Sequence, residues 1–398
     1  MTERERIRRA LEPLHASDDT LEEVFAMIDR DKAVKHLKHT GRNTLRTVAV
    51  AAALVLALSV TAYAIGEYTG FFETVFGGED AGKQTYDLPV DSWDEDGSQK
   101  TMQIVTEGQP VDQETAQRVL DGSVTTAGAS VTVGDYTCKV EDVTMAENGV
   151  GVMTYTIESE KGFPSLTVTD KTWGIFSLGG GMPLEAGDGA SNLRDDPMVY
   201  PAGTDMNAGF GLDVAASLVS QTDTKLTVAA YMAMFQMGEC PEALDVYFFW
   251  GDKGDFSDNY KVTVPLAEPA EAVELKSEDG WTASVSPMGL ALMEPADDSE
   301  GETGLGDVIV HYADGTEYVV QKDEPYTVNR RVACGDVGIH RLVFNRLIDP
   351  EAVESVTITR NEYVVQDADG QPVDMTGLDT LPDGCTEVEV PVETTFTK

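Results

Sequence analysis

The chain has 398 residues, room for roughly two to three domains, and 41% of them are hydrophobic, so most of it should bury a core. Its formal net charge of −42 is unevenly distributed. Residues 1–46 hold ten basic and nine acidic side chains, whereas residues 67–398 hold 18 and 61. So acidic a surface excludes direct nucleic-acid binding by the larger part, because phosphate contacts need Lys and Arg.

Residues 1–46 are predicted to form a short helical head with an apolar stripe. A first helix runs from Thr2 to Leu14, and Thr20 with Glu23 forms a capping box that begins a second one. The helical spacing places these apolar side chains on the stripe: Ile7, Leu11, Leu21, Val24, Phe25 and Ile28. Two helices this short cannot bury the stripe alone, which favours a partner protein. Packing of the helices on each other, on a second copy or on a membrane surface stays open.

Residues 47–66 carry no charge, in contrast to the basic segment that precedes them. At about 1.5 Å per residue, a helix of this length spans a hydrocarbon core of about 30 Å. A buried core helix and a cleaved signal ending at Ala64 are the alternatives, but the apolar run has no polar face and its leader is long. The sequence therefore predicts one transmembrane helix and a lipid bilayer as partner. The positive-inside rule puts residues 1–46 in the cytoplasm and the acidic region outside.

Residues 67–122 are interpreted as a juxtamembrane segment and an acidic spacer. The aromatic residues at its start, Tyr68, Phe71, Phe72 and Phe76, fit either a belt at a membrane surface or a short helix packed on the outer region. From Glu79 the composition is acidic and polar, and a short helix is expected over 112–120.

The remaining residues are predicted to form two immunoglobulin-like β-sandwich domains, 123–267 and 268–398, which makes the fold class mainly β. β-branched and aromatic runs such as "VGVMTYTIES" and "KLTVAAYMAMF" alternate with Gly, Asp and Pro up to Pro265, and a second set begins at Ala272. Asp314-Gly315 in "YADGTEY" predicts a tight hairpin, and "TEVEVPVETTF" a trailing strand.

No catalytic, cofactor-binding or metal-binding residue is predicted. The outer histidines, His311 and His340, have no nucleophile motif nearby. The acidic loops lack the bidentate acid that an EF-hand requires at its twelfth position. The four cysteines are far apart, which favours isolated thiols over a zinc site and leaves one disulfide possible.

With these segments placed, the chain resembles single-pass, anti-sigma-factor-like membrane proteins of Gram-positive bacteria, especially clostridia. The resemblance is carried by "RRALEPLHASDDTLEEVFAMI" at 8–28, "AYAIGEYTGFFETVFGG" after the apolar run, "VSPMGL" at 285–290 and "HYADGTEY" at 311–318. It implies a cytoplasmic head that holds an extracytoplasmic-function sigma factor inactive, and outer immunoglobulin-like domains whose function is unknown. Zinc-type heads use a His and two Cys, and this head has no Cys, so the contact would be a zinc-free helical surface.

The sequence thus predicts a non-enzymatic regulator. Its head would bind a sigma factor through the stripe, and its β domains would sense an unidentified extracellular ligand. The alternative is an anchored cell-surface binding or adhesion module with no role in transcription.

Overall fold

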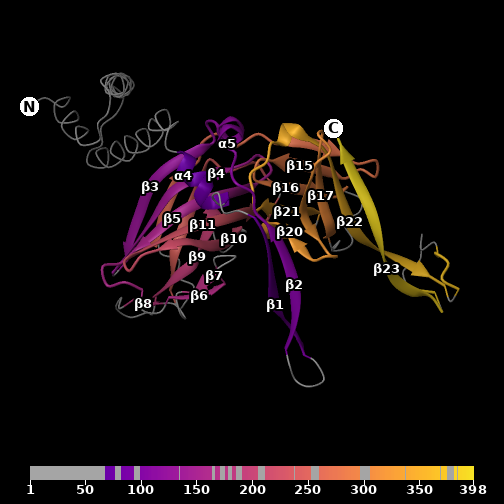
Figure 1. Ribbon diagram of the computed structural model, residues 1–398, viewed down its shortest axis with the longest axis horizontal. Coiled ribbons are helices and arrows are strands. Elements are labelled where there is room, and N and C mark those ends of the chain that lie inside the picture. The colour runs from indigo at the N-terminus through magenta and orange to yellow at the C-terminus, as the bar shows by residue number, and fades with distance from the viewer. Residues whose placement is uncertain are drawn as a thin grey trace, which may run out of the picture. The chain divides into compact units, whose positions relative to one another are not determined.

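Alternating apolar residues build the described chain almost entirely from β-strands, arranged in two large sheets (Figure 1). The computed structural model describes residues 68–398 except 77–81, 94–98, 134, 164–165, 171–174, 178–181, 185–190, 205–210, 237, 252–259, 296–304, 337, 368, 374–380 and 383. All of these residues belong to one unit, which runs from Gly66 to Lys398.

The N-terminal sheet has nine strands in the order β13-β12-β9-β10-β11-β5-β4-β3, with β8 paired to β9. They are β3 (Val124–Val133), β4 (Tyr136–Met145), β5 (Val150–Glu158), β8 (Met182–Leu184), β9 (Ser191–Pro201), β10 (Leu212–Gln221), β11 (Lys225–Met234), β12 (Ala243–Gly251) and β13 (Lys261–Pro265). Strands β6 (Thr167–Asp170) and β7 (Ile175–Ser177) form a separate pair. The end strands β13 and β3 contact each other, so the sheet curls around one apolar core.

Strand β5 is buried on both faces, which explains its nearly continuous apolar sequence. Met153, Tyr155 and Ile157 face the inner core of the N-terminal sheet, whereas Val150 and Val152 belong to a second core on the outer face. Strand β11 divides its side chains between the same two cores. A strand that is covered on both sides has no solvent face on which to place charges.

The C-terminal sheet has twelve strands in the order β1-β2-β19-β18-β17-β22-β23-β14-β15-β16-β21-β20. They are β1 (Lys83–Trp93), β2 (Gln99–Glu107), β14 (Val273–Lys276), β15 (Thr282–Ser286), β16 (Gly289–Met293), β17 (Leu305–Tyr312), β18 (Glu317–Lys322), β19 (Thr327–Val328), β20 (Arg330–Asp336), β21 (Ile339–Phe344), β22 (Val353–Gln366) and β23 (Thr386–Thr397). The hairpin predicted at Asp314-Gly315 is confirmed: Gly315 has φ +82°, and Asp314 accepts the N–H of Thr316 at 2.8 Å.

Strands β1 and β2 lie where the sequence indicated a spacer, and they join the C-terminal sheet although the N-terminal sheet follows them in the chain. A buried polar network holds the end of β2. Asn329 accepts the N–H of Glu107 at 2.6 Å and donates to the carbonyl of Val319 at 2.7 Å. Asn345 and Arg346 donate to the Glu107 carbonyl at 3.3 and 2.6 Å. The C-terminal sheet is therefore discontinuous in sequence, and Figure 1 shows β1–β2 as a long hairpin that extends from it.

Two helices cover the outer face of the N-terminal sheet. In α4 (Tyr68–Phe76), the side chains of Phe71, Phe72, Val75 and Phe76 are all buried, and the Tyr231 hydroxyl donates to the Val75 carbonyl. These aromatic residues therefore pack in a protein core, and the membrane-surface belt that the sequence also allowed is not what they form. The helix predicted over 112–120 is confirmed as α5 (Gln113–Leu120).

The core that contains α4 and α5 joins the two sheets, and we call it the junction core. It takes Ala116 and Leu120 from α5, Val150 from the N-terminal sheet, and Val332 and Val343 from β20 and β21 of the C-terminal sheet. Its members come from both helices and from both sheets, so these elements form one packed unit.

The predicted fold class needs correction. The described residues are mainly β with two short helices, and none of the helices in this part of the chain is long and apolar enough to cross a membrane. This finding contradicts the expected class of a helical head with a transmembrane helix, and with it the single-pass membrane localisation. The head (1–46) and the apolar run (47–66) themselves lie outside the described residues.

Replacement of Asp245 by Asn should reduce the pH dependence of the free energy of unfolding in the acid range. Burial favours the neutral carboxyl, but hydrogen bonds from Thr263 and Lys261 and from the N–H of Gly203 outweigh it, so the pKa of Asp245 lies below its usual 3.8. The stabilisation is therefore present above pH 3.8 and is lost as the pH falls through the folded-state value. We expect the variant to lose about 2 kcal/mol at pH 7 and less at lower pH, by urea unfolding. An equal loss at pH 7 and pH 2 would contradict this assignment.

Candidate functional site

The turn between β4 and β5 carries polar contacts from one sheet to the other. The Asn148 side-chain amide donates to the carbonyls of Ser284 and Gly289 at 2.9 and 3.1 Å. In return, Arg341 of β21 donates to the carbonyls of Asn148 and Met234 at 2.8 and 2.6 Å. Each sheet thus supplies donors to the backbone of the other, and this fixes their relative position.

Glycine is required in this turn for two reasons. Gly149 has φ +76°, a conformation that side chains with a Cβ rarely adopt, and its Cβ would lie 2.9 Å from the Nε atom of Arg341. The Arg341 side chain is buried against the turn, and this burial lowers its pKa below the usual 12.5. Because the guanidinium is buried among carbonyl groups, its hydrogen bonds to them are fixed structural contacts.

The segment "VSPMGL" forms the complementary turn on the C-terminal sheet, between β15 and β16. Met288 at its tip is fully buried in the junction core. Ser286 closes the turn by donating to the Gly289 carbonyl at 3.1 Å. Gly289 lies so close to the N-terminal sheet that its Cβ would be 2.9 Å from a methyl carbon of Val150.

A cleft of about 670 Å³ opens beside this junction. Four segments form it: the end of α5 with the residues after it, Glu147 in the turn between β4 and β5, the connection between the sheets at 268–273, and the turn at 349–351. Backbone hydrogen bonds between the segment of Ala270 and that of Glu147 hold the connection in place. The Glu147 carboxylate also accepts the N–H of Ala272 at 3.1 Å. The carboxylates that line the cleft are those of Asp121, Glu147, Glu268, Glu271, Asp349 and Glu351.

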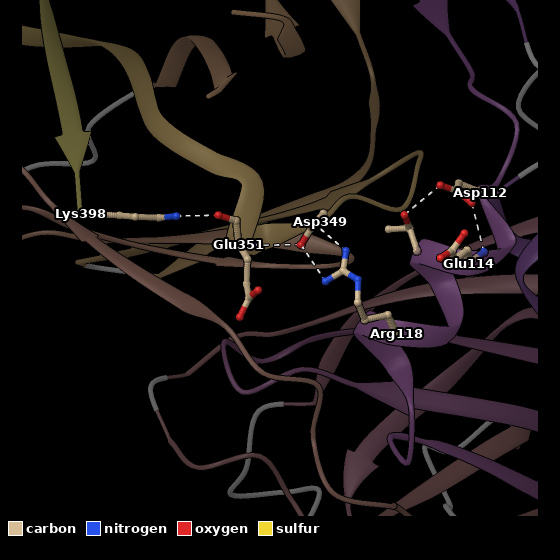
Figure 2. Close-up of polar contacts among 7 residues, drawn as sticks. Asp112, Glu114, Arg118, Asp349, Glu351 and Lys398 are labelled. Carbon is tan, nitrogen blue, oxygen red and sulfur yellow. Dashed lines mark hydrogen bonds and ion pairs between the residues drawn. The ribbon is translucent and has the colours of Figure 1, made fainter. Parts of the chain in front are cut away.

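Arg118 is the one basic side chain among the described residues that line the cleft. Its guanidinium reaches from α5 to the Asp349 carboxylate, 2.6 Å away, as Figure 2 shows. Asp349 also accepts the N–H of Glu351 at 3.2 Å, which caps the 3-10 turn Pro350–Ala352. The hydrogen bond to Asp349 and the charge of that carboxylate raise the pKa of Arg118 above its usual value.

The other end of α5 is fixed by its cap. Asp112 accepts the backbone N–H of Glu114 at 3.1 Å and the hydroxyl of Thr115 at 2.9 Å (Figure 2). The hydrogen bond from Thr115, followed by that from Glu114, lowers the pKa of Asp112 below 3.8. Asp112 therefore stays ionised at the helix N-terminus, where a negative charge is favourable.

The described part of the chain shows no group of three or more His, Cys, Asp or Glu residues arranged to hold a metal ion. His311 contacts Thr357 and Glu317, and His340 contacts Glu294. The four cysteines are free thiols, and burial raises the pKa of Cys138. These contacts are structural. The carboxylates that line the cleft attract cationic groups, so the site offers electrostatic recognition.

The site residues predicted from the sequence are not among the described residues. These residues are Ile7, Leu11, Leu21, Val24, Phe25 and Ile28. The pairing of Arg118 with Asp349 could not be predicted from local sequence, because the two residues are 231 positions apart. The Asn148-Gly149 dipeptide is a turn signal that can be recognised in the sequence, but its contact with Arg341 cannot be.

Comparisons with known proteins leave the family undetermined. No protein-family model and no curated protein matches the chain. A solved structure, the crystal structure of the conserved domain protein from Bacillus anthracis, is similar at 11% sequence identity with a TM-score of 0.32. The match covers 69% of this chain and 93% of that one, and a similarity this low supports no further conclusion.

Proposed function

We propose that the chain is a non-enzymatic regulator that holds a sigma factor through its N-terminal residues and controls that contact through its β unit. The observation that supports this is the position of α4, the first described segment after the N-terminal residues. Its four apolar side chains are buried in the junction core that both sheets share. A change in how the sheets pack would therefore act on α4, and through it on the chain that precedes it.

The contact surface proposed for the sigma factor is the apolar stripe defined by the sequence. Its spacing is that of one helix face, and helix-in-groove recognition uses anchors at these positions. The acidic β unit is unsuited to DNA, so regulation would act on the sigma factor itself and not on the promoter.

Val24→Asp with Phe25→Asp should abolish capture of the sigma factor, because two charges would enter the centre of an apolar contact. The measurement is co-purification of the full chain with sigma factors encoded by the same genome, each tested as a purified protein. We expect at least a hundredfold loss of affinity.

The control is Ala26→Asp, which adds one negative charge at a neighbouring position outside the stripe, where the test variant adds two within it. Capture that survives Val24→Asp with Phe25→Asp would contradict the stripe assignment. Transcription that is unchanged after deletion of residues 2–29 would instead favour the binding module without a regulatory role.

A further inference from the structure

We propose that the Arg118–Asp349 ion pair is a charge-controlled clasp that sets how readily helices α4 and α5 detach from the junction core. The proposal deepens the proposed function, because α4 is the segment that would pass a change in the β unit to the N-terminal residues. The clasp itself requires no sigma factor and can be tested without one.

The first step of the argument is that α5 and α4 are linked to each other. Gln113 of α5 donates to the Glu73 carboxylate of α4 at 3.1 Å, and Ala116 and Leu120 share the junction core with the α4 side chains. Arg118 lies on the exposed side of the same helix, so its pairing with Asp349 ties the two helices to the C-terminal sheet.

The second step is that the clasp is open to solvent. The Arg118 side chain is 50% exposed and that of Asp349 is 26% exposed. Dissolved salt and cationic groups therefore reach both partners, and an ion pair at this exposure is screened by salt. The buried contacts of Arg341 at the other end of the junction are made to carbonyl groups, and dissolved ions do not reach them.

The third step is that the surroundings of the clasp repel one another. Arg118 compensates a cleft in which five further carboxylates accompany that of Asp349. Without the guanidinium, the carboxylates on the two sides of the cleft would repel each other and favour separation of α5 from the turn at 349–351. The apolar contacts of α4 remain, so the clasp adjusts detachment by a modest factor.

The test is hydrogen–deuterium exchange on the full chain, comparing wild type with Arg118→Gln, Asp349→Asn and the double variant. Asn retains the cap on Glu351 and removes only the charge. We expect exchange in α4 and α5 to be about two- to fivefold faster than in wild type in each single variant, a modest change because exposed ion pairs contribute little. The double variant should exchange no faster than the single variants. Strands β12 and β22 should not change.

Wild type in 1 M NaCl, where the Debye length is about 3 Å, should approach the rate of the single variants. The matched control is Lys225→Gln, which breaks an exposed pair with Glu158, 2.9 Å, within the N-terminal sheet. The proposal is overturned if α4 and α5 exchange at the wild-type rate in both single variants, if the two effects add, or if β12 and β22 accelerate equally. None of these outcomes depends on whether a sigma factor binds.

Discussion

Gly289→Ala is expected to destabilise the β unit by about 3 kcal/mol, the largest loss that overpacking of a core usually causes. The added Cβ would lie 2.9 Å from a methyl carbon of Val150 and closer still to the carbonyl oxygen of Leu342. A backbone carbonyl cannot rotate away as a flexible side chain can, so β16 and β21 must separate or the two sheets must move apart. The measurement is urea unfolding followed by circular dichroism.

The control for this effect is Gly238→Ala, whose Cβ would have Met234 at 3.9 Å as its nearest neighbour. It should stay within about 0.5 kcal/mol of wild type, as surface substitutions usually do. If Gly289→Ala does not fold, partial recovery by Val150→Ala in the double variant would assign that part of the defect to the contact between the sheets, because the contact with the Leu342 carbonyl remains. A Gly289→Ala variant as stable as wild type would disprove the close approach of the sheets.

Asn329→Ala should release the β1–β2 hairpin and cost about 3 kcal/mol. The amide satisfies the N–H of Glu107 and the carbonyl of Val319 in a region where Asn329 is 2% exposed. Removing it leaves two partly buried backbone groups without this partner, at about 1–3 kcal/mol for each. Beyond this network, β2 reaches β19 through one bridge, Val105 to Thr327, so little else retains the hairpin.

Limited proteolysis resolves this release from general unfolding. Cleavage within 83–107 should appear at protease concentrations that leave 113–265 intact. The matched control, Gln103→Ala, removes an exposed amide from the same hairpin and should leave the digestion pattern unchanged. Simultaneous loss of the hairpin and the N-terminal sheet would show that Asn329 stabilises the unit as a whole.

Several elements that follow from local sequence were predicted correctly, but strands β9 and β10 were not predicted. The strands of both sets, the Asp314-Gly315 hairpin and the helix after Asp112 each depend on residues within ten positions of one another. Alternation, turn chemistry and a cap residue are sufficient signals at that range. The prediction of two separate sandwiches did not include the burial of β5 on both faces.

The cleft and the β1–β2 docking could not be read in this way, because their partners are distant in sequence. The acidic composition of 79–122 indicated a spacer, although β1 and β2 are strands that pair with each other, and β2 also pairs with β19 more than 200 residues further on. For Phe71 and Phe72, the sequence could not distinguish a membrane surface from a protein core, since both environments favour aromatic side chains beside a polar segment. The head residues remain a prediction from helical spacing alone.

The discontinuous C-terminal sheet has a consequence for the order in which the chain folds during synthesis. The bond between Glu107 and Asn329 spans 222 positions, so the β1–β2 hairpin leaves the ribosome long before the part of the C-terminal sheet that it joins exists. The N-terminal sheet, made only from 124–265, can complete its own strand pairing first. We therefore expect the β1–β2 hairpin to stay undocked from the C-terminal sheet until the last third of the chain emerges. Its acidic side chains would keep the waiting segment soluble in the meantime.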